Sequence, residues 1–269
     1  NPGFVYWTNK FDPDRQDPAN NVEVSSPQDP LQNGFVYNGL AYAFSKAGLY
    51  ALYPGLGDTT FTPSKTSCSR GHWTPLSFCV GPQVFFLSND GIYATAGGLE
   101  QAITDDKVRP LFDPDQSGTT FGGIGLVDYT ATSYMFMAYY KNEVWFQYRG
   151  KDSATHILVF DVRYRRWRHI SALATRSMYA DEQVVANLIL GGENGHLYQD
   201  TGDDDGGTAI AAEVETGLIT IGVPLVHKEW GHLITDLNPA GATVTVKVYS
   251  AKGATQLATT TSASATRTR

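Results

Sequence analysis

The sequence predicts an all-β fold made of repeated hairpins, as in a β-propeller. Its 269 residues include 27 Gly, 15 Tyr and 13 Phe, and 42% of them are hydrophobic against 17% charged. This balance is typical of many short strands joined by tight turns. Sustained helical periodicity is missing from the sequence. Only Leu99–Val108 and Ser171–Val185 contain enough helix-forming residues for a turn or two, so we expect little helix.

Four segments share one pattern, which is the main evidence for a repeat. In each, an apolar strand meets a polar turn, and a second strand follows in which an aliphatic residue precedes an aromatic one. In three of the four the turn ends in Gly, which tolerates the positive φ of tight hairpin turns. The segments are Leu40–Leu52, Val84–Ala94, Glu143–Val162 and Asn187–Tyr198.

The spacing of these hairpins matches propeller blades. Tyr50, Tyr93, Phe160 and Tyr198 mark equivalent places, at intervals of 43, 67 and 38 residues. Two of the three intervals fall near the roughly 40 to 50-residue period of blades. The long interval contains the Gly- and Thr-rich stretch Gly118–Gly125, which we interpret as an insertion or an extra strand pair. A blade cannot cover both its faces alone, so packing blades side by side would bury them.

The aliphatic–Tyr pairs that open the second strands are predicted to be blade core. Successive residues of a strand point to opposite faces. One member of each pair should therefore pack against one neighbouring blade, and the other against the opposite neighbour. The pairs are Leu49 with Tyr50, Ile92 with Tyr93, and Leu197 with Tyr198.

We divide the chain into propeller blades over residues 1–208 and closing strands with a partial β-sandwich over residues 209–269. The division falls in the polar, Gly-containing stretch Asp200–Thr208, which is typical of a linker or long loop. A chain that begins at Asn1 rather than Met and stops at Arg269, just after a strand-like run, is consistent with a piece of a longer polypeptide. Beyond the division, strands are expected at Ile210–Ile221, Trp230–Asp236 and Ala242–Tyr249.

Charge and cysteine content narrow the classes of function. A net charge of -7 argues against a protein that grips nucleic acid through a broad basic surface, and leaves transient passage of DNA open. Cys68 and Cys79 have none of the spacings of a zinc or redox site, so we expect two free thiols, with a disulfide as the alternative. No apolar run is long enough for a membrane span and no signal peptide opens the chain, which predicts a soluble protein with no membrane partner.

No residues form a recognisable catalytic, cofactor-binding or metal-binding motif. Acidic clusters have too few ligands in calcium-loop spacing, so we interpret them as solvated turns. The histidines never form a His-Glu-x-x-His motif, and no Gly-x-Ser-x-Gly occurs. Gly122–Gly125 lacks the Lys of a phosphate-binding loop. The acidic clusters are Asp12 to Asp17, Asp113 with Asp115, and Asp203 to Asp205; the histidines are His72, His156, His169, His196, His227 and His232.

The densest basic run spans Arg163–His169, where aromatic and basic residues alternate. One interpretation is a nucleic-acid groove in which bases stack on Tyr164 and Trp167. The interpretation we favour places Trp167 in the blade core and the arginines at carboxylates, because one short run in an acidic chain is weak evidence for a groove. The predicted subunit-contact residues are Arg163, Arg165, Arg166 and Arg168.

Three stretches, in this order, resemble the tail hub or nozzle propellers of short-tailed bacteriophages. They are Val5–Asn9 with Asp17–Asn21 and Gly48–Leu52; Val80–Tyr93; and Glu215–Gly222 with Lys228, Glu229 and Val244–Tyr249. The third is similar to the passage from propeller to Ig-like sandwich in that family. None of the three is a catalytic signature.

The resemblance implies a structural virion protein of the phage tail with no cofactor and no small-molecule substrate. Copies of the chain would form a ring below the portal and adaptor, continue the DNA channel and help retain packaged DNA. If DNA slides through such a ring, its wall should be neutral or acidic, because each neutralised phosphate would retard movement.

Two other classes of function stay open, because propellers serve many functions. One is a glycan-cleaving enzyme with two carboxylates about 5 to 10 Å apart across a pocket, although no pair in the sequence stands out. The other is a glycan- or receptor-binding propeller that uses an exposed aromatic residue, such as Trp73 or Trp230, as a platform.

Overall fold

A computed structural model describes the chain in residues 2–8, 14, 17, 19–55, 60–104, 108–170, 175–181, 187–199, 204–205, 208–209, 235–237, 244–249, 256–262 and 266–268. The chain divides into two compact units, Asn1–Thr201 and Gly202–Arg269. This division lies within the stretch whose composition is typical of a linker.

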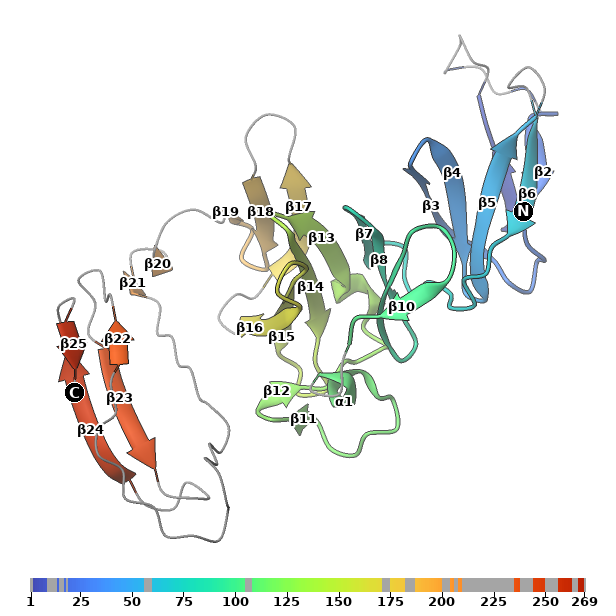
Figure 1. Cartoon of the computed structure of the whole chain (residues 1–269). Coiled ribbons are helices and arrows are strands. Elements are labelled where there is room, and N and C mark those ends of the chain that lie inside the picture. The colour runs from blue at the N-terminus through green and yellow to red at the C-terminus, as the bar shows by residue number, and fades with distance from the viewer. Residues whose placement is uncertain are drawn as a thin grey trace, which may run out of the picture. The chain divides into compact units, whose positions relative to one another are not determined.

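The first unit consists mainly of four antiparallel sheets that follow one another along the chain, which we call blades 1 to 4 (Figure 1). Blade 1 is formed by β3 (Leu31–Tyr37), β4 (Leu40–Ser45), β5 (Gly48–Pro54) and β6 (Phe61–Lys65). Blade 2 is formed by β7 (Phe78–Val80), β8 (Val84–Ser88), β9 (Gly91–Thr95) and β10 (Glu100–Ala102). Blade 3 is formed by β13 (Phe136–Tyr140), β14 (Glu143–Arg149), β15 (Thr155–Asp161) and β16 (Arg166–Ile170). Blade 4 contains β17 (Thr175–Asp181), β18 (Asn187–Gly192) and β19 (Leu197–Gln199).

The all-β fold class is confirmed, and so are the four hairpins. Each predicted hairpin forms the second and third strands of its blade, and strands pair in simple up-and-down order within every blade. The turn glycines are needed where they occur: Gly91 has φ +155, and a Cβ at this position would overlap the Thr104 hydroxyl. The described residues do not form a closed ring of blades.

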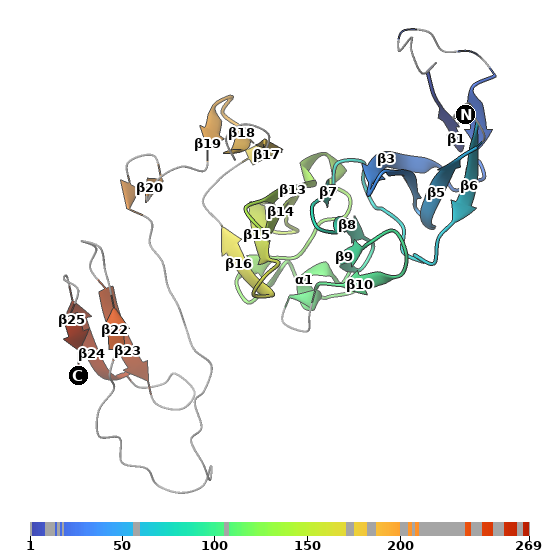
Figure 2. The same ribbon diagram turned by 45° about the horizontal axis from the view of Figure 1, so that its top comes forward.

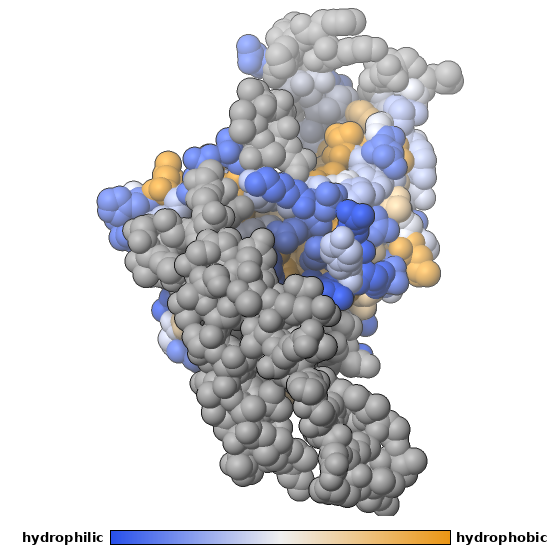
Figure 3. All heavy atoms as spheres, turned by 60° about the vertical axis from the view of Figure 1, so that its left-hand side comes forward, coloured by the Kyte–Doolittle hydropathy of each residue, from blue (hydrophilic) through white to orange (hydrophobic). Residues whose placement is uncertain are grey.

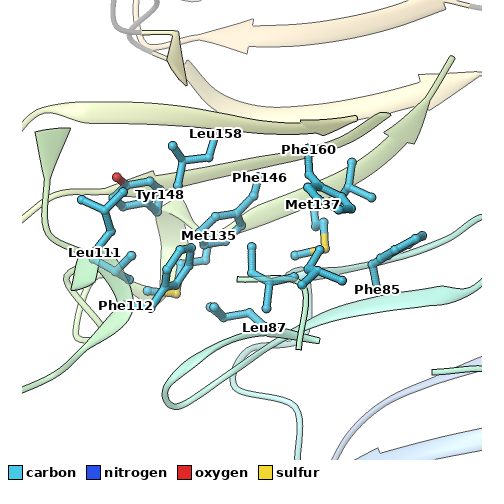
Figure 4. Packing of buried hydrophobic residues seen from close by; sticks show 14 of the residues in the cluster. Phe85, Leu87, Leu111, Phe112, Met135, Met137, Phe146, Tyr148, Leu158 and Phe160 are labelled. Carbon is cyan, nitrogen blue, oxygen red and sulfur yellow. The ribbon is translucent and has the colours of Figure 1, made fainter. Parts of the chain in front are cut away.

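Apolar side chains fill the space between consecutive blades. The largest cluster joins blades 2 and 3, and Figure 4 shows Phe85 and Leu87 of blade 2 facing Met137, Phe146 and Phe160 of blade 3. A second cluster joins blades 1 and 2, and a third joins blades 3 and 4. Burial against the next sheet is what stabilises each of these short strands.

The aliphatic–Tyr pairs pack as predicted in blades 1 and 2. Ile92 lies in the cluster shared with blade 3, and Tyr93 in the cluster shared with blade 1. Leu49 likewise faces blade 2, and Tyr50 packs on the opposite side, where the short strands β1 (Phe4–Tyr6) and β2 (Asn21–Glu23) pair with each other.

The prediction is wrong for Leu197. This side chain is 78% exposed, although its partner Tyr198 packs in the cluster shared with blade 3. By analogy with Ile92, Leu197 points away from blade 3, and no described residues form a further blade there. Tyr179 of β17 is 63% exposed on the same face of blade 4.

The two segments that contained helix formers are not helical where they are described. Glu100–Ala102 pairs with β9, and Thr175–Asp181 pairs with β18, so sheet pairing overrides the local propensity. The described residues contain only α1 (Arg109–Phe112) and the 3-10 turn η2 (Thr132–Tyr134), which agrees with the small helix content expected. Both lie in the connection between blades 2 and 3.

The extra strand pair that was one of two interpretations of Gly118–Gly125 is present. It consists of β11 (Thr120–Phe121) and β12 (Ile124–Gly125), which pair antiparallel. Leu111, Phe112 and Leu126 of the same connection are buried in the cluster between blades 2 and 3. Figure 2 shows α1 next to blades 2 and 3, so the connection closes one end of their interface.

The second unit is described only in short strands, and its expected sandwich stays a prediction. The expected strand at Ala242–Tyr249 is present as β23, and the end of the one expected at Trp230–Asp236 is present in β22. Ile210–Ile221 and Trp230 lie outside the described residues. No helix in the described part of the chain is long and apolar enough to cross a membrane. The strands are β20 (Asp204–Asp205), β21 (Thr208–Ala209), β22 (Thr235–Leu237), β23 (Val244–Tyr249), β24 (Gln256–Ser262) and β25 (Thr266–Thr268).

Candidate functional site

The basic run forms the turn and outer edge of blade 3. Arg163 and Arg165 lie in the turn between β15 and β16, and Arg166 and Arg168 lie on β16, which is the last strand of its sheet. All four side chains are exposed. Tyr164 in the same turn is 61% exposed. The structure therefore brings the four arginines together on one edge.

The arginines differ in their partners. Arg168 donates to Glu143 Oε2 across the sheet at 2.6 Å, and its guanidinium lies 5.0 Å from the Trp145 ring centre. Exposed ion pairs of this kind contribute little to stability. Arg163, Arg165 and Arg166 have no carboxylate partner in the part of the chain that the structure describes, so three cations at this edge are available to another molecule.

Arg165 adopts a backbone conformation that Arg rarely adopts. Its φ is +52, in the left-handed region. Residues with a Cβ other than Asn and Asp seldom occupy this region, at a cost of roughly 1–2 kcal/mol. A hydrogen bond from the Tyr164 N–H to Asp161 Oδ1 at 2.8 Å stabilises the turn. A long cationic side chain thus occupies a place that would suit Asn or Gly better.

Trp167 takes the place favoured for it from the sequence. Its ring is half-buried, packs on Phe160 at a centroid distance of 4.9 Å, and donates its indole N–H to Ile103 O at 3.3 Å. Ile103 follows the last strand of blade 2, so Trp167 links two blades. The stacking platform required by the nucleic-acid interpretation is therefore reduced to Tyr164.

A cavity of about 230 Å³ lies between blades 1 and 2. It is lined by Lys46 of the β4–β5 turn, by Arg70, His72 and Trp73 of the connection between the two blades, and by Asn89 of the β8–β9 turn. Backbone hydrogen bonds hold the connection to both blades, from His72 N to Ser45 O and from Trp73 N to Leu87 O, each at 2.9 Å. The wall of the cavity is therefore fixed by main-chain contacts.

His72 is a fully buried imidazole in that wall. Ser77 Oγ donates its only proton to Thr74 O at 3.0 Å, so at 3.2 Å it accepts from the His72 Nε2–H. Burial lowers the pKa of His72 to about 4, so the ring is neutral at physiological pH. Its Nδ1 is then an acceptor without a hydrogen-bond partner among the described residues. Such a group costs about 1–3 kcal/mol.

A second histidine cluster lies at the β14–β15 turn of blade 3. Asp152 accepts from His156 Nε2 at 3.0 Å, and His156 Nδ1 lies 3.0 Å from His169 Nε2. A Cβ at Gly125 or Gly150 would overlap Asp152 or His156, so backbone encloses the cluster. Burial, followed by the nearby His156, lowers the pKa of His169, against the opposing effect of Asp152. Because these hydrogen bonds join both sides of the β14–β15 turn to β16, we interpret this cluster as a support for the turn.

The acidic clusters act as turns where they are described. Asp17 Oδ1 accepts the Ala19 N–H, and Asp113 Oδ1 accepts the Asp115 N–H, both at 2.9 Å. The side chains of Asp12 and of Asp203 to Asp205 lie outside the described residues, as do His227 and His232. Among the residues that the structure describes, no group of three or more potential ligands could hold a metal ion.

The expected free thiols are confirmed. Cys68 and Cys79 are both unpaired and buried, and they lie in different clusters between blades. Burial raises the pKa of both thiols, that of Cys68 to about 12. Neither is a reactive nucleophile at neutral pH.

Two features of these sites were not predicted from the sequence. His156 and His169 are diagonal neighbours on adjacent antiparallel strands, which the register Leu158↔His169 establishes. The cavity joins residues from three separate connections. A strand alignment of the β15–β16 hairpin could have found the first, whereas the second had no signal in the sequence.

No protein-family model matches the chain, and no curated protein sequence matches it. Among solved structures, the chain is similar to the extracellular domain of BT4673, a one component system candidate from B. thetaiotaomicron, with a TM-score of 0.42 and 16% identity. The similarity covers 71% of this chain and 23% of that chain, so the matched part spans less than a quarter of that structure. We draw no argument about fold or function from a likeness at this level.

Proposed function

We propose that the protein is a structural component of a bacteriophage tail, a nozzle or hub protein whose copies form a ring. The ring would continue the DNA channel and help retain packaged DNA, with the portal, adaptor and other tail proteins as neighbours. The ordered resemblance of three stretches to that family supports the proposal, as does the series of blades. We propose no catalytic role.

The observation that carries the proposal is the arginine edge of blade 3, formed by Arg163, Arg165, Arg166 and Arg168. Three of these cations have no carboxylate partner among the described residues, and Tyr164 stands exposed between them. Arg and Tyr are enriched in protein interfaces, where guanidinium groups bind carboxylates in bidentate fashion. The chain has 27 acidic against 20 basic side chains, so a second copy offers many possible partners.

A contact between a basic edge and an acidic surface elsewhere on the next copy is heterologous. Contacts of this type build rings when the rotation between copies closes. Arg165 supports a role in contact, because its side chain stands at a position where it strains the backbone, and such strain is often found at functional sites. A contact at the edge would account for Arg at this position.

Among the residues that Figure 3 draws in colour, hydrophilic side chains predominate and hydrophobic ones form separate small groups. A mostly hydrophilic surface of this kind is compatible with an assembly held by ion pairs.

The first test is the oligomeric mass of the purified chain at 150 mM salt. We expect the wild-type chain to form one oligomer of defined size. The double variant Arg165→Glu/Arg166→Glu should have the mass of the monomer. The matched control, Lys65→Glu/Arg109→Glu, reverses two other exposed cations and should keep the assembly. A monomeric wild-type chain, or equal behaviour of both double variants, would contradict the proposed contact.

The second test is location. A gold-labelled antibody against the chain should decorate the tail of the parent virion in negative-stain images. Labelling confined to the capsid, or absent from virions, would contradict the tail assignment even if the purified chain formed a ring.

A further inference from the structure

We propose that the cavity between blades 1 and 2 binds one acidic sugar residue, a hexose-sized ring that carries a carboxylate. This inference is independent of the tail assignment, because it depends only on the lining of the cavity. The volume of about 230 Å³ is smaller than the cavities that hold drug-sized ligands and suits a single ring.

The charges around the cavity favour a carboxylate at Lys46. Arg70 forms an ion pair with Asp90 at 3.0 Å and lies over the Tyr93 ring, so its charge is already matched. Glu100 accepts hydrogen bonds from the Ser69 hydroxyl and N–H at 2.7 and 3.1 Å, and is not part of the lining. Lys46 has no ion-pair partner among the described residues. It is the one lining cation left for an anionic group.

The remaining wall suits hydroxyl and C–H groups. Trp73 presents a half-buried indole whose N–H is fixed by Tyr129 O at 3.2 Å, and the Lys46 ammonium lies 5.3 Å from its ring centre. Sugar rings place their C–H faces on aromatic rings of this kind. Asn89 can donate and accept hydrogen bonds.

The cavity is formed by two hairpin turns and by a connection that passes close to one of them. A Cβ at Gly71 would overlap the backbone of Lys46, so only Gly allows the connection to pass this close to the β4–β5 turn. The turns that contribute Lys46 and Asn89 join equivalent strands of successive blades. The site is therefore produced by the blade repeat together with one close backbone approach.

The test is a titration of the full chain with D-glucuronate, D-galacturonate and N-acetylneuraminate, followed through the indole N–H signals in heteronuclear NMR. The chain has five Trp, and loss of one signal in Trp73→Phe assigns that of Trp73. We expect at least one acidic sugar to shift the Trp73 signal in a saturable way. Glucose, acetate and inorganic phosphate should each bind at least about tenfold more weakly than the acidic sugar. Glucose lacks the negative charge, and acetate and phosphate lack the ring.

Two variants locate the site. Lys46→Ala should weaken binding of the acidic sugar about tenfold or more, as loss of one charge-assisted hydrogen bond does. Lys65→Ala is the matched control, because Lys65 is also exposed on blade 1 and lies over an aromatic ring, that of Tyr50 at 6.0 Å. It should leave binding unchanged.

The proposal is overturned if none of the three acidic sugars shifts the Trp73 signal at 50 mM, or if Lys46→Ala binds as tightly as wild type. Equal binding of glucose would overturn the acidic class of ligand. Equal binding of acetate or phosphate would overturn the sugar and leave a general anion site. A folded Lys46→Ala chain is expected, since the side chain is exposed, and its unchanged NMR spectrum elsewhere verifies this.

Discussion

Replacing Ile92 with Ala tests the packing of blade on blade. Ile92 is 0% exposed and lies in the cluster between blades 2 and 3, so the substitution removes buried carbon atoms from a filled interface. Three carbon groups at about 0.8 kcal/mol each correspond to a transfer loss of about 2.4 kcal/mol. The cavity that remains adds roughly 1 kcal/mol. We therefore expect the free energy of unfolding to fall by about 3–4 kcal/mol.

The assay is urea unfolding followed by tryptophan fluorescence, with the slope of the transition compared between variants. Leu197→Ala is the matched control, because Leu197 opens the equivalent strand of blade 4 and is 78% exposed. Exposed substitutions of this kind change stability by about 0.5 kcal/mol or less. If Ile92→Ala cost no more than Leu197→Ala, the assignment of the aliphatic–Tyr pairs to the interfaces between blades would be wrong.

Four further outcomes follow from the same contacts. Arg165→Asn should raise the free energy of unfolding by about 1 kcal/mol or less, because Asn tolerates the left-handed region. The same substitution should weaken the assembly in mass measurements. A lower free energy of unfolding would speak against strain at this turn. Burial lowers the pKa of His72 from 6.5 to about 4, so the folded chain binds fewer protons than the unfolded chain between these two pH values. The stability is therefore full above about pH 6.5, and roughly 3 kcal/mol of it is lost as the pH falls to 4. Urea titrations across this range should show a flatter profile for His72→Phe, and an unchanged profile would assign the acid sensitivity elsewhere. A Cβ at Gly81 would lie 2.8 Å from the Tyr139 ring, so Gly81→Ala should lower the free energy of unfolding by about 1–3 kcal/mol. Gly98→Ala should lower it less, because the nearest contact of a Cβ there is 3.6 Å. The opposite order would refute the close approach of blades 2 and 3. Fluorescence anisotropy should detect no DNA binding by the isolated chain at 150 mM salt, and binding with a steep salt slope would instead support a clamp formed by the arginines.

The hairpins were predictable from the sequence because their signals are local. A strand and its turn are specified by adjacent residues, as in Val84–Ala94, where an apolar run meets a turn that ends in Gly91. The opposite directions of Ile92 and Tyr93 then follow from strand geometry alone. The same reasoning failed for Leu197, because it assumed a further blade beyond blade 4 that the described residues do not contain.

The connection between blades 2 and 3 was only partly predictable. The strand pair within Gly118–Gly125 was one of two interpretations, and α1 was not anticipated, since four residues carry no periodicity. Phe112 and Leu126 acquire their places from packing against blades 2 and 3. Such contacts depend on the whole unit and leave no pattern in the segment itself.

The candidate sites differ in the same way. The arginine run is visible in the sequence because its members are adjacent, and the hairpin exposes them together. The cavity depends on the backbone of Gly71 passing Lys46, which are 25 residues apart, and on the hydroxyl of Ser77 fixing the tautomer of His72. These are properties of tertiary structure, so the sequence identified Trp73 only as a possible platform.

Electron cryomicroscopy of the purified chain tests the central claim most directly. The account predicts symmetric rings with an open axial channel, in which Arg163, Arg165 and Arg166 contact carboxylates of the adjacent copy and the channel wall is neutral or acidic. Isolated monomers, or a ring in which three or more of the four arginines of the edge line the channel, would contradict it.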